Sequence, residues 1–99
     1  MDSILPKEQI KEKVMLTIMF HPKAQKELDA LSVRFQNQIS GQLSVLEKLD
    51  HPLQHPRVIK LQGGDGHDYR LRVGDYRVKF ILRRKDVLVT HVHDRKVGY

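Results

Sequence analysis

The sequence contains no cysteine, no tryptophan and no apolar run as long as a membrane-spanning helix requires. The absence of cysteine excludes disulfides and thiolate metal sites, and it fits a reducing compartment. A transmembrane helix needs about 20 consecutive apolar residues. The N-terminal residues also lack the apolar core of a signal peptide. We therefore expect a cytoplasmic protein that has no membrane partner.

Acidic residues are the minority among the charged ones: 12 aspartates and glutamates stand against 18 lysines and arginines, which gives a formal charge of +6. With 99 residues, the chain is long enough for one domain, which buries roughly 60–65% of the surface of its unfolded chain. A core this small predicts a functional site on the surface. The positive field favours a polyanion or an acidic protein partner, and a merely solvated basic surface is the alternative.

The first half of the chain predicts one strand followed by two helices. Residues 16–20 form a short apolar run of strand-forming residues that stops at a proline. Apolar residues then recur at helical spacing over residues 24–49, and Ser32 divides this stretch because it caps the second helix. The second helix ends before Pro52. We expect the leucines of these helices to pack in the core: Leu28, Leu31, Leu43 and Leu46.

The second half of the chain predicts consecutive strands. A short extended segment and a glycine-rich turn come first, at residues 58–61 and 63–66. Strands are then predicted at residues 69–73, 76–82 and 87–93, joined by a glycine-first turn at Gly74-Asp75 and by a turn at residues 83–86. Helices that precede a run of strands indicate an α+β fold, in which an N-terminal strand and a two-helix hairpin pack on a small antiparallel β-sheet.

Strand alternation gathers the positive charge of the first hairpin on one face. Opposed like charges on adjacent strands repel by up to about 1 kcal/mol per pair, so a face without acid favours an anionic ligand. The arginine fork also fits phosphate and stacks on bases. We therefore favour phosphate or RNA binding over a solvated face, with an acidic protein partner as a further alternative. The residues of this face are Arg70, Arg72, Arg77 and Lys79, and Arg95 follows near the end of the last strand.

The run Tyr69–Phe80, YRLRVGDYRVKF, resembles the central signature of the RelE/ParE toxin superfamily. The preceding Lys60–Gly63 matches the K-L-x-G lead-in of that signature, and Val92–Tyr99 resembles the closing pattern, which contains an arginine and a tyrosine. The resemblance covers residues 16–99, which we assign to a RelE-like toxin domain. Residues 1–15 are assigned to an N-terminal extension that forms either a short helix or an irregular tail.

Similarity to the RelE branch implies a toxin of a type II toxin–antitoxin system. Such a toxin is a ribosome-dependent endoribonuclease that cleaves mRNA and inhibits translation. The implied partners are a cognate antitoxin and mRNA on the ribosome, and the implied chemistry uses no metal and no cofactor. The resemblance carries catalytic roles onto Arg70, Arg72, Arg77, Arg95 and Tyr99. RNA contacts are expected from Lys60, Lys79 and His93.

Two other functions are compatible with the resemblance. The ParE branch keeps the fold and poisons DNA gyrase, and an inactive member would only bind its antitoxin. Positive charge at each of the basic positions of the signature favours the RelE branch. One departure concerns the chemistry: Arg70 and Arg72 stand where RelE proteins can have lysine, and arginine is a poor general base because it stays protonated.

Six histidines offer another source of proton transfer. His91 and His93 share one face of the last strand, so His93 is a candidate general acid or base, with a structural or solvent-exposed role as the alternative. His67 lies in the glycine-rich turn, from which it can approach the site. No spacing typical of zinc ligands is present, so we expect no metal site. The remaining three adjoin prolines and are assigned to turns: His21, His51 and His55.

Overall fold

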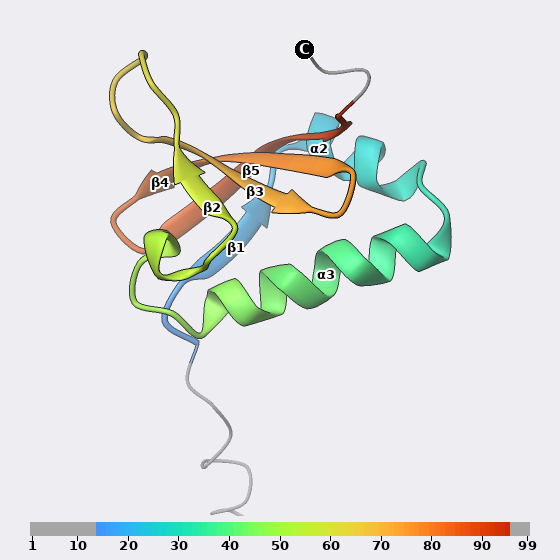
Figure 1. Ribbon diagram of the computed structural model, residues 1–99, viewed down its shortest axis with the longest axis horizontal. Helices are drawn as coiled ribbons and strands as arrows, with labels where there is room; N and C mark the ends of the chain where they lie inside the picture. The colour runs from blue at the N-terminus through green and yellow to red at the C-terminus, as the bar shows by residue number, and fades with distance from the viewer. Residues whose placement is uncertain (1–13, 96–99) are drawn as a thin grey trace, which may run out of the picture.

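The computed structural model describes residues 14–95 and consists of a five-stranded sheet, with the longer helix running across one of its faces (Figure 1). Tyr99, like the first 13 residues of the expected N-terminal extension, lies outside the described residues. The elements in chain order are β1 (Thr17–Phe20), α2 (Pro22–Asp29), α3 (Val33–Glu47), the 3-10 turn η1 (Pro52–Gln54), β2 (Val58–Lys60), β3 (Asp68–Val73), β4 (Tyr76–Arg83) and β5 (Asp86–Asp94).

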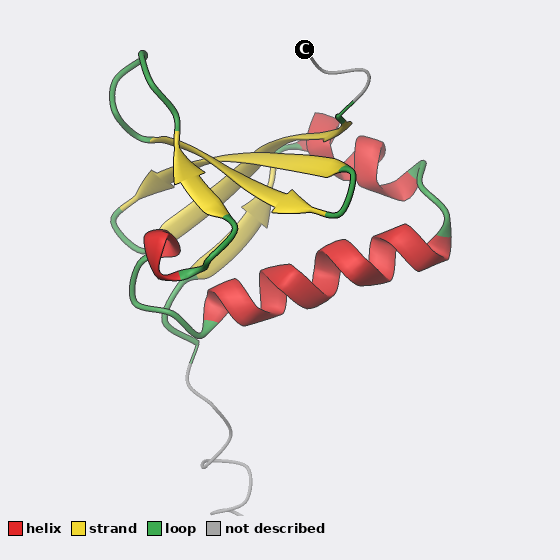
Figure 2. Cartoon of the chain, viewed as in Figure 1, coloured by secondary structure: helices red, strands yellow, loops and turns green. Residues whose placement is uncertain are grey.

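The strands follow the order β1-β5-β4-β3-β2 across the sheet. Consecutive strands from β2 to β5 pair in antiparallel fashion, as the sequence predicts. The sheet is nevertheless mixed, because β1 lies parallel to β5. The two helices connect β1 at one edge of the sheet to β2 at the opposite edge, and the antiparallel strands that follow end with β5 beside β1. The predicted α+β fold, with strand, helix pair and sheet in that order, is confirmed (Figure 2).

Both helices begin at the predicted positions, but their N-termini are capped differently. His21 precedes α2, and its Nδ1 accepts a hydrogen bond of 3.1 Å from the backbone N–H of Lys23. Ser32 precedes α3 as expected, yet its side chain makes no capping hydrogen bond, so the predicted side-chain cap is wrong. Gly74 has a φ of 58°, as a glycine-first hairpin turn requires. No helix within residues 14–95 is long and apolar enough to cross a membrane.

The core lies between α3 and the inner face of the sheet, defined here as the face turned toward α3. Three of the four predicted leucines are buried there, namely Leu28, Leu43 and Leu46, and Leu31 is partly buried against them. The sheet contributes the alternate residues of β3 and β4, and the rings of Tyr69 and Phe80 stack with centroids 5.5 Å apart. Inward-facing Val58 extends this apolar layer to β2, at the edge of the sheet.

His55 is a turn residue, as predicted, but it is also buried, with 3% of its surface exposed. Its Nε2 lies 2.9 Å from Oε1 of Gln42 on α3, and its Nδ1 accepts a hydrogen bond from the backbone N–H of Arg57. Burial, together with the positive charge of Arg57, lowers the pKa of His55. The neutral ring therefore joins α3 to the segment that enters β2.

Candidate functional site

The outer face of the sheet, turned away from α3, carries the basic residues of the first hairpin. The strand register places Arg70 opposite Lys79, and Arg72 opposite Arg77. On the next strand, His91 lies opposite Lys79 and His93 lies opposite Arg77. Cross-strand partners share a face of the sheet. These residues therefore form one surface, called the basic face from here on: Arg70, Arg72, Arg77, Lys79, His91 and His93.

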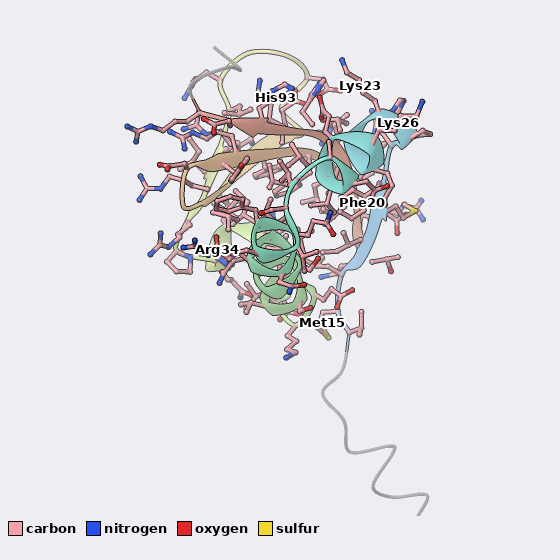
Figure 3. The ribbon with its side chains drawn as sticks, turned by 90° about the vertical axis from the view of Figure 1, so that its right-hand side faces the viewer. Met15, Phe20, Lys23, Lys26, Arg34 and His93 are labelled. Atoms are coloured by element: carbon pink, nitrogen blue, oxygen red, sulfur yellow. The ribbon has the colours of Figure 1, made fainter. Side chains whose placement is uncertain are left out.

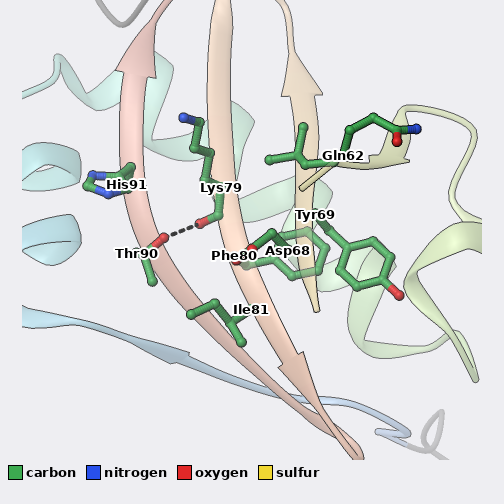
Figure 4. A pocket seen from close by; sticks show the side chains of 9 residues that line it. Gln62, Asp68, Tyr69, Lys79, Phe80, Ile81, Thr90 and His91 are labelled. Atoms are coloured by element: carbon green, nitrogen blue, oxygen red, sulfur yellow. Dashed lines mark hydrogen bonds between the residues drawn. The ribbon is translucent and has the colours of Figure 1, made fainter. Parts of the chain in front are cut away.

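A β-bulge in β5 places both His91 and His93 on this face. Phe80 pairs with Val89 and Lys79 pairs with His91, so Thr90 is an extra residue without an opposite partner. Before the bulge Val89 points into the core, and after it Val92 does. The change of phase turns His91 and His93 outward. The Thr90 hydroxyl donates a hydrogen bond of 3.3 Å to the carbonyl oxygen of Lys79, which holds the bulge in place (Figure 4).

Arg77 is a cation of the basic face with buried hydrogen-bond donors that are not satisfied. Its Nε and Nη1 atoms are buried and have no hydrogen-bond partner among residues 14–95. Leaving a buried charged donor unpaired costs more free energy than leaving a neutral one unpaired, and such groups are rare in folded proteins. A half-buried guanidinium with two unpaired donor nitrogens is suited to binding an anion with several acceptor oxygens, such as a phosphate.

Helix α2 brings a carboxylate to the edge of the basic face. Oε1 of Glu27 accepts a hydrogen bond of 2.8 Å from the backbone N–H of Val92. Its Oε2 lies 3.1 Å from Nε2 of His93, and the rings of His91 and His93 are 5.0 Å apart. Figure 3 shows His93 on the side of the sheet away from α3. The two hydrogen bonds of Glu27 join α2 to β5 beyond the end of β1.

The electrostatics of His91 follow from its surroundings. Burial lowers the pKa of His91, and the adjacent His93, Lys23 and Lys79 lower it further against an opposing effect of Glu27. These surroundings favour the neutral form of the His91 imidazole over the charged form. Nδ1 of His91 and Nδ1 of His93 are both buried without a hydrogen-bond partner in the described part of the chain.

The other predicted site residues do not all join the basic face. Lys60 lies opposite Tyr69, so it belongs to the inner face, at the exposed edge of the sheet. Arg95 is exposed, and its backbone N–H donates a hydrogen bond to the carbonyl oxygen of Asp75, which places it beside the turn of the first hairpin. The structure thus brings Arg95 to the region of Arg77 and leaves Lys60 apart.

Two hollows adjoin the basic face. One has a volume of about 180 Å³ and is lined by Arg57, Arg70 and Arg72 together with Pro56 and Ile59. The other, about 410 Å³, lies over β3, β4 and β5 and is shown in Figure 4. Its lining includes Lys79 and His91 on one side and the apolar Ile81 on another. A cationic wall beside an apolar one suits a ligand that has both charged and flat apolar parts.

Sequence reasoning missed two residues of this region, Arg57 and Glu27. Arg57 precedes β2, and its carbonyl oxygen accepts a hydrogen bond from the N–H of Arg72. A basic residue just before a short strand would have been the only signal for it. Glu27 is far from His93 in the sequence, and helical spacing gave no reason to single it out. The expectation of a hairpin face without acid is wrong, because Glu27 and Asp68 border this face.

Comparison with solved structures places this fold among toxin–antitoxin proteins. No protein-family model and no curated protein matches the sequence. The chain is similar to one in the archaeal RelE–RelB complex from Pyrococcus horikoshii OT3, with 26% identity over 85% of this chain and 99% of that one, at a TM-score of 0.69. It is also similar to a chain in the RelBE2 toxin–antitoxin complex of Mycobacterium tuberculosis, with 21% identity over 86% of this chain and 98% of that one, at a TM-score of 0.69. A chain of the ParDE system of P. aeruginosa is similar as well, with 14% identity over 81% of this chain and 96% of that one, at a TM-score of 0.61.

Proposed function

We propose that this chain, which belongs by its fold to the RelE/ParE toxin superfamily, is the toxin of a type II toxin–antitoxin pair and cleaves mRNA on the ribosome. The solved complexes to which it is similar hold a toxin together with its antitoxin, which supports a cognate antitoxin as the resident partner. The observation that carries the nuclease proposal is Arg77, a half-buried arginine of the basic face with two buried donor nitrogens that lack a partner among residues 14–95.

The arrangement of charges fits an RNA backbone. Arg70, Arg72 and Arg77 lie on neighbouring strands of one face, and Arg57 lines a hollow with the first two. Phosphate contacts fix the position of a nucleic acid, and arginine supplies paired donors to the phosphate oxygens. Single-stranded RNA also offers unstacked bases, which can lie against apolar or aromatic side chains. The hollow beside Lys79 and Ile81 has the mixed lining that such a base requires.

The proposed reaction is attack of a ribose 2′-hydroxyl on the adjacent phosphorus. The new bond joins the 2′-oxygen to phosphorus, and the bond from phosphorus to the 5′-oxygen breaks. The 2′-hydroxyl proton leaves to a base and the 5′-oxygen gains a proton, so the products are a 2′,3′-cyclic phosphate and a 5′-hydroxyl. Arg77 would stabilise the charge that develops on the phosphorane, and Arg70 and Arg72 would hold the backbone.

The remaining roles concern the leaving group and the protons. Arg95 would lie near the leaving oxygen, and Tyr99 would stack on a base or orient the nucleophile. Arginine is protonated at every working pH, which makes it a poor proton acceptor. His93 is therefore the candidate for proton transfer, because a histidine exchanges protons near neutral pH and its ring is oriented by Glu27.

Arg77→Ala tests the proposal, with Arg34→Ala on α3 as the matched control. Arg34 is an exposed arginine on the helix of the inner side, over the ring of Phe35. We expect the wild type and Arg34→Ala to arrest translation and to cut reporter mRNA within its reading frame, as primer extension would detect. Arg77→Ala should cut at least 100-fold more slowly, because loss of one donor to a developing oxyanion costs about 10²–10³ in rate.

Cells that express the wild type or the variants also distinguish the nuclease from the two alternative functions. The similarity to ParDE makes inhibition of DNA gyrase the second candidate. Blocked plasmid supercoiling with intact mRNA would replace the nuclease by a gyrase poison. Efficient mRNA cleavage by Arg77→Ala would refute the assigned role of Arg77. Binding to the antitoxin without growth arrest, supercoiling loss or cleavage would identify an inactive antitoxin-binding module.

A further inference from the structure

We propose that Glu27, His91 and His93 form a binding site for a divalent transition-metal ion of the Zn²⁺ type. The three residues come from α2 and from β5, and each offers one ligand atom, with all of these atoms within 4.8 Å of one another. This inference goes beyond the proposed nuclease and does not depend on it. It also revises the expectation, based on sequence spacing alone, that the histidines hold no metal.

The geometry is close to that of a bound ion. Ligand atoms held by one zinc ion at 2.0–2.2 Å are about 3–3.6 Å from one another in a tetrahedral arrangement. Oε2 of Glu27 and Nε2 of His93 are already 3.1 Å apart. Since Oε1 of Glu27 is held by the backbone N–H of Val92, its Oε2 stays directed toward the histidine ring. A metal ion would take the place of the proton that joins Oε2 to Nε2.

The positions of the two histidines favour a metal. Residues i and i+2 on one strand face present two imidazoles to the same point, and the bulge at Thr90 turns this pair toward Glu27. Nδ1 of His91 is buried without a hydrogen-bond partner in residues 14–95, so this ring keeps an unused ligand atom within the cluster.

The same cations limit the affinity and point to the kind of ion. Lys79 and Lys23 act on His91, and Arg77 lies opposite His93, so a dication meets positive charge. The three protein ligands are two nitrogens and one oxygen, a set that suits Zn²⁺ better than Ca²⁺ or Mg²⁺. We expect a dissociation constant on the order of 10 µM, weaker than structural zinc sites with four ligands.

Isothermal titration of the full chain with ZnCl₂ at pH 7.5 tests the site. We expect one equivalent of Zn²⁺ to bind and the variants His91→Gln, His93→Gln and Glu27→Gln each to bind at least 10-fold more weakly. Glu27→Gln keeps an acceptor oxygen for the N–H of Val92, so it removes the carboxylate with the least effect on the fold. Zinc at ten times its dissociation constant should raise the melting temperature of the wild type by roughly 5–10 °C.

His67→Gln is the matched control, since His67 is an exposed histidine outside the cluster. It should bind Zn²⁺ like the wild type, and circular dichroism should show that every variant is folded. The proposal is overturned if the wild type binds no Zn²⁺ below about 1 mM, if any of the three cluster variants keeps wild-type affinity, or if His67→Gln loses affinity equally. None of these readouts uses RNA cleavage, so a failed nuclease proposal and a failed metal proposal are distinguishable.

Discussion

The two faces of the β3–β4 hairpin differ in how well the rest of the protein packs against their side chains and pairs their hydrogen-bonding groups. On the inner face, Leu71, Val78 and Phe80 are fully buried in the apolar core. On the outer face, the same strands carry Arg72 opposite Arg77, and Arg77 has two buried donor nitrogens without a partner in the described part of the chain. Burial of the inner face stabilises the fold, whereas the unpaired donors of Arg77 on the outer face destabilise it.

This contrast indicates that stability and binding are assigned to different faces of the same strands. A residue of the inner face should change the free energy of unfolding when it is altered. A residue of the outer face should change binding, with little loss or even a gain of stability. Measurements that compare the two faces can strengthen this division or refute it.

The largest expected effect is on the inner face, at Phe80. Phe80 is 1% exposed and stacks on Tyr69, so truncation leaves a cavity that the neighbouring strands cannot fill. We expect Phe80→Ala to lower the free energy of unfolding by about 3–5 kcal/mol, measured by urea denaturation. A loss below about 1 kcal/mol would mean that the inner face does not provide the stability attributed to it.

A second, smaller effect concerns pH and the buried, hydrogen-bonded His55. Its pKa is lowered in the folded state from a value of 6.5, so between 6.5 and the lower folded pKa the unfolded chain binds more protons. Stability should therefore decrease as the pH falls from 6.5 through the folded pKa and level off below it. Urea denaturation between pH 7.5 and pH 5 measures this slope, and His55→Gln should reduce it.

Two other histidines provide the comparison for that slope. The pKa of His91 on the outer face is lowered as well, so His91→Gln should remove a separate part of the pH dependence. The same substitution at an exposed histidine, His67→Gln, serves as the control. An unchanged slope in His55→Gln would show that the neutral ring is not what holds α3 to the segment before β2.

The smallest effect should have the opposite sign, at Arg77. Replacement by methionine keeps most of the length of the side chain and removes the buried donors that lack a partner. We expect Arg77→Met to raise the free energy of unfolding by up to about 1 kcal/mol while it abolishes RNA cleavage. A loss of 2 kcal/mol or more in the same denaturation experiment would place Arg77 among the residues that stabilise the fold.

The sequence predicts the fold well because the fold depends on local patterns. Alternation over residues 69–73 and 76–82, helical spacing over residues 24–49 and a glycine in the hairpin turn each act over a few neighbouring residues. The parallel pairing of β1 with β5 was not predicted, because it joins the two ends of the described chain. A pattern within a few neighbouring residues cannot predict a contact between residues so far apart in the sequence.

The candidate site was predicted in part for the same reason. Arg70, Arg72, Arg77 and Lys79 follow from alternation within one hairpin, and the structure places them together. The contact of Glu27 with His93 depends on how α2 packs against β5, which alternation does not encode. Lys60 was grouped with the site because of its motif, although the register puts it on the other face.

The extra residue at Thr90 divides β5 into two halves that alternate in opposite phase. If β5 kept Thr90 but lost the bulge, regular alternation would exchange the directions of Val92 and His93, so it would bury a histidine and expose a valine. Deletion of Thr90 should preserve both directions, whereas a single insertion next to the bulge should alter the core and the surface at once. We expect the length of this strand to be under stronger constraint than most of its side chains, and a set of single-residue insertions and deletions along β5 would measure that constraint.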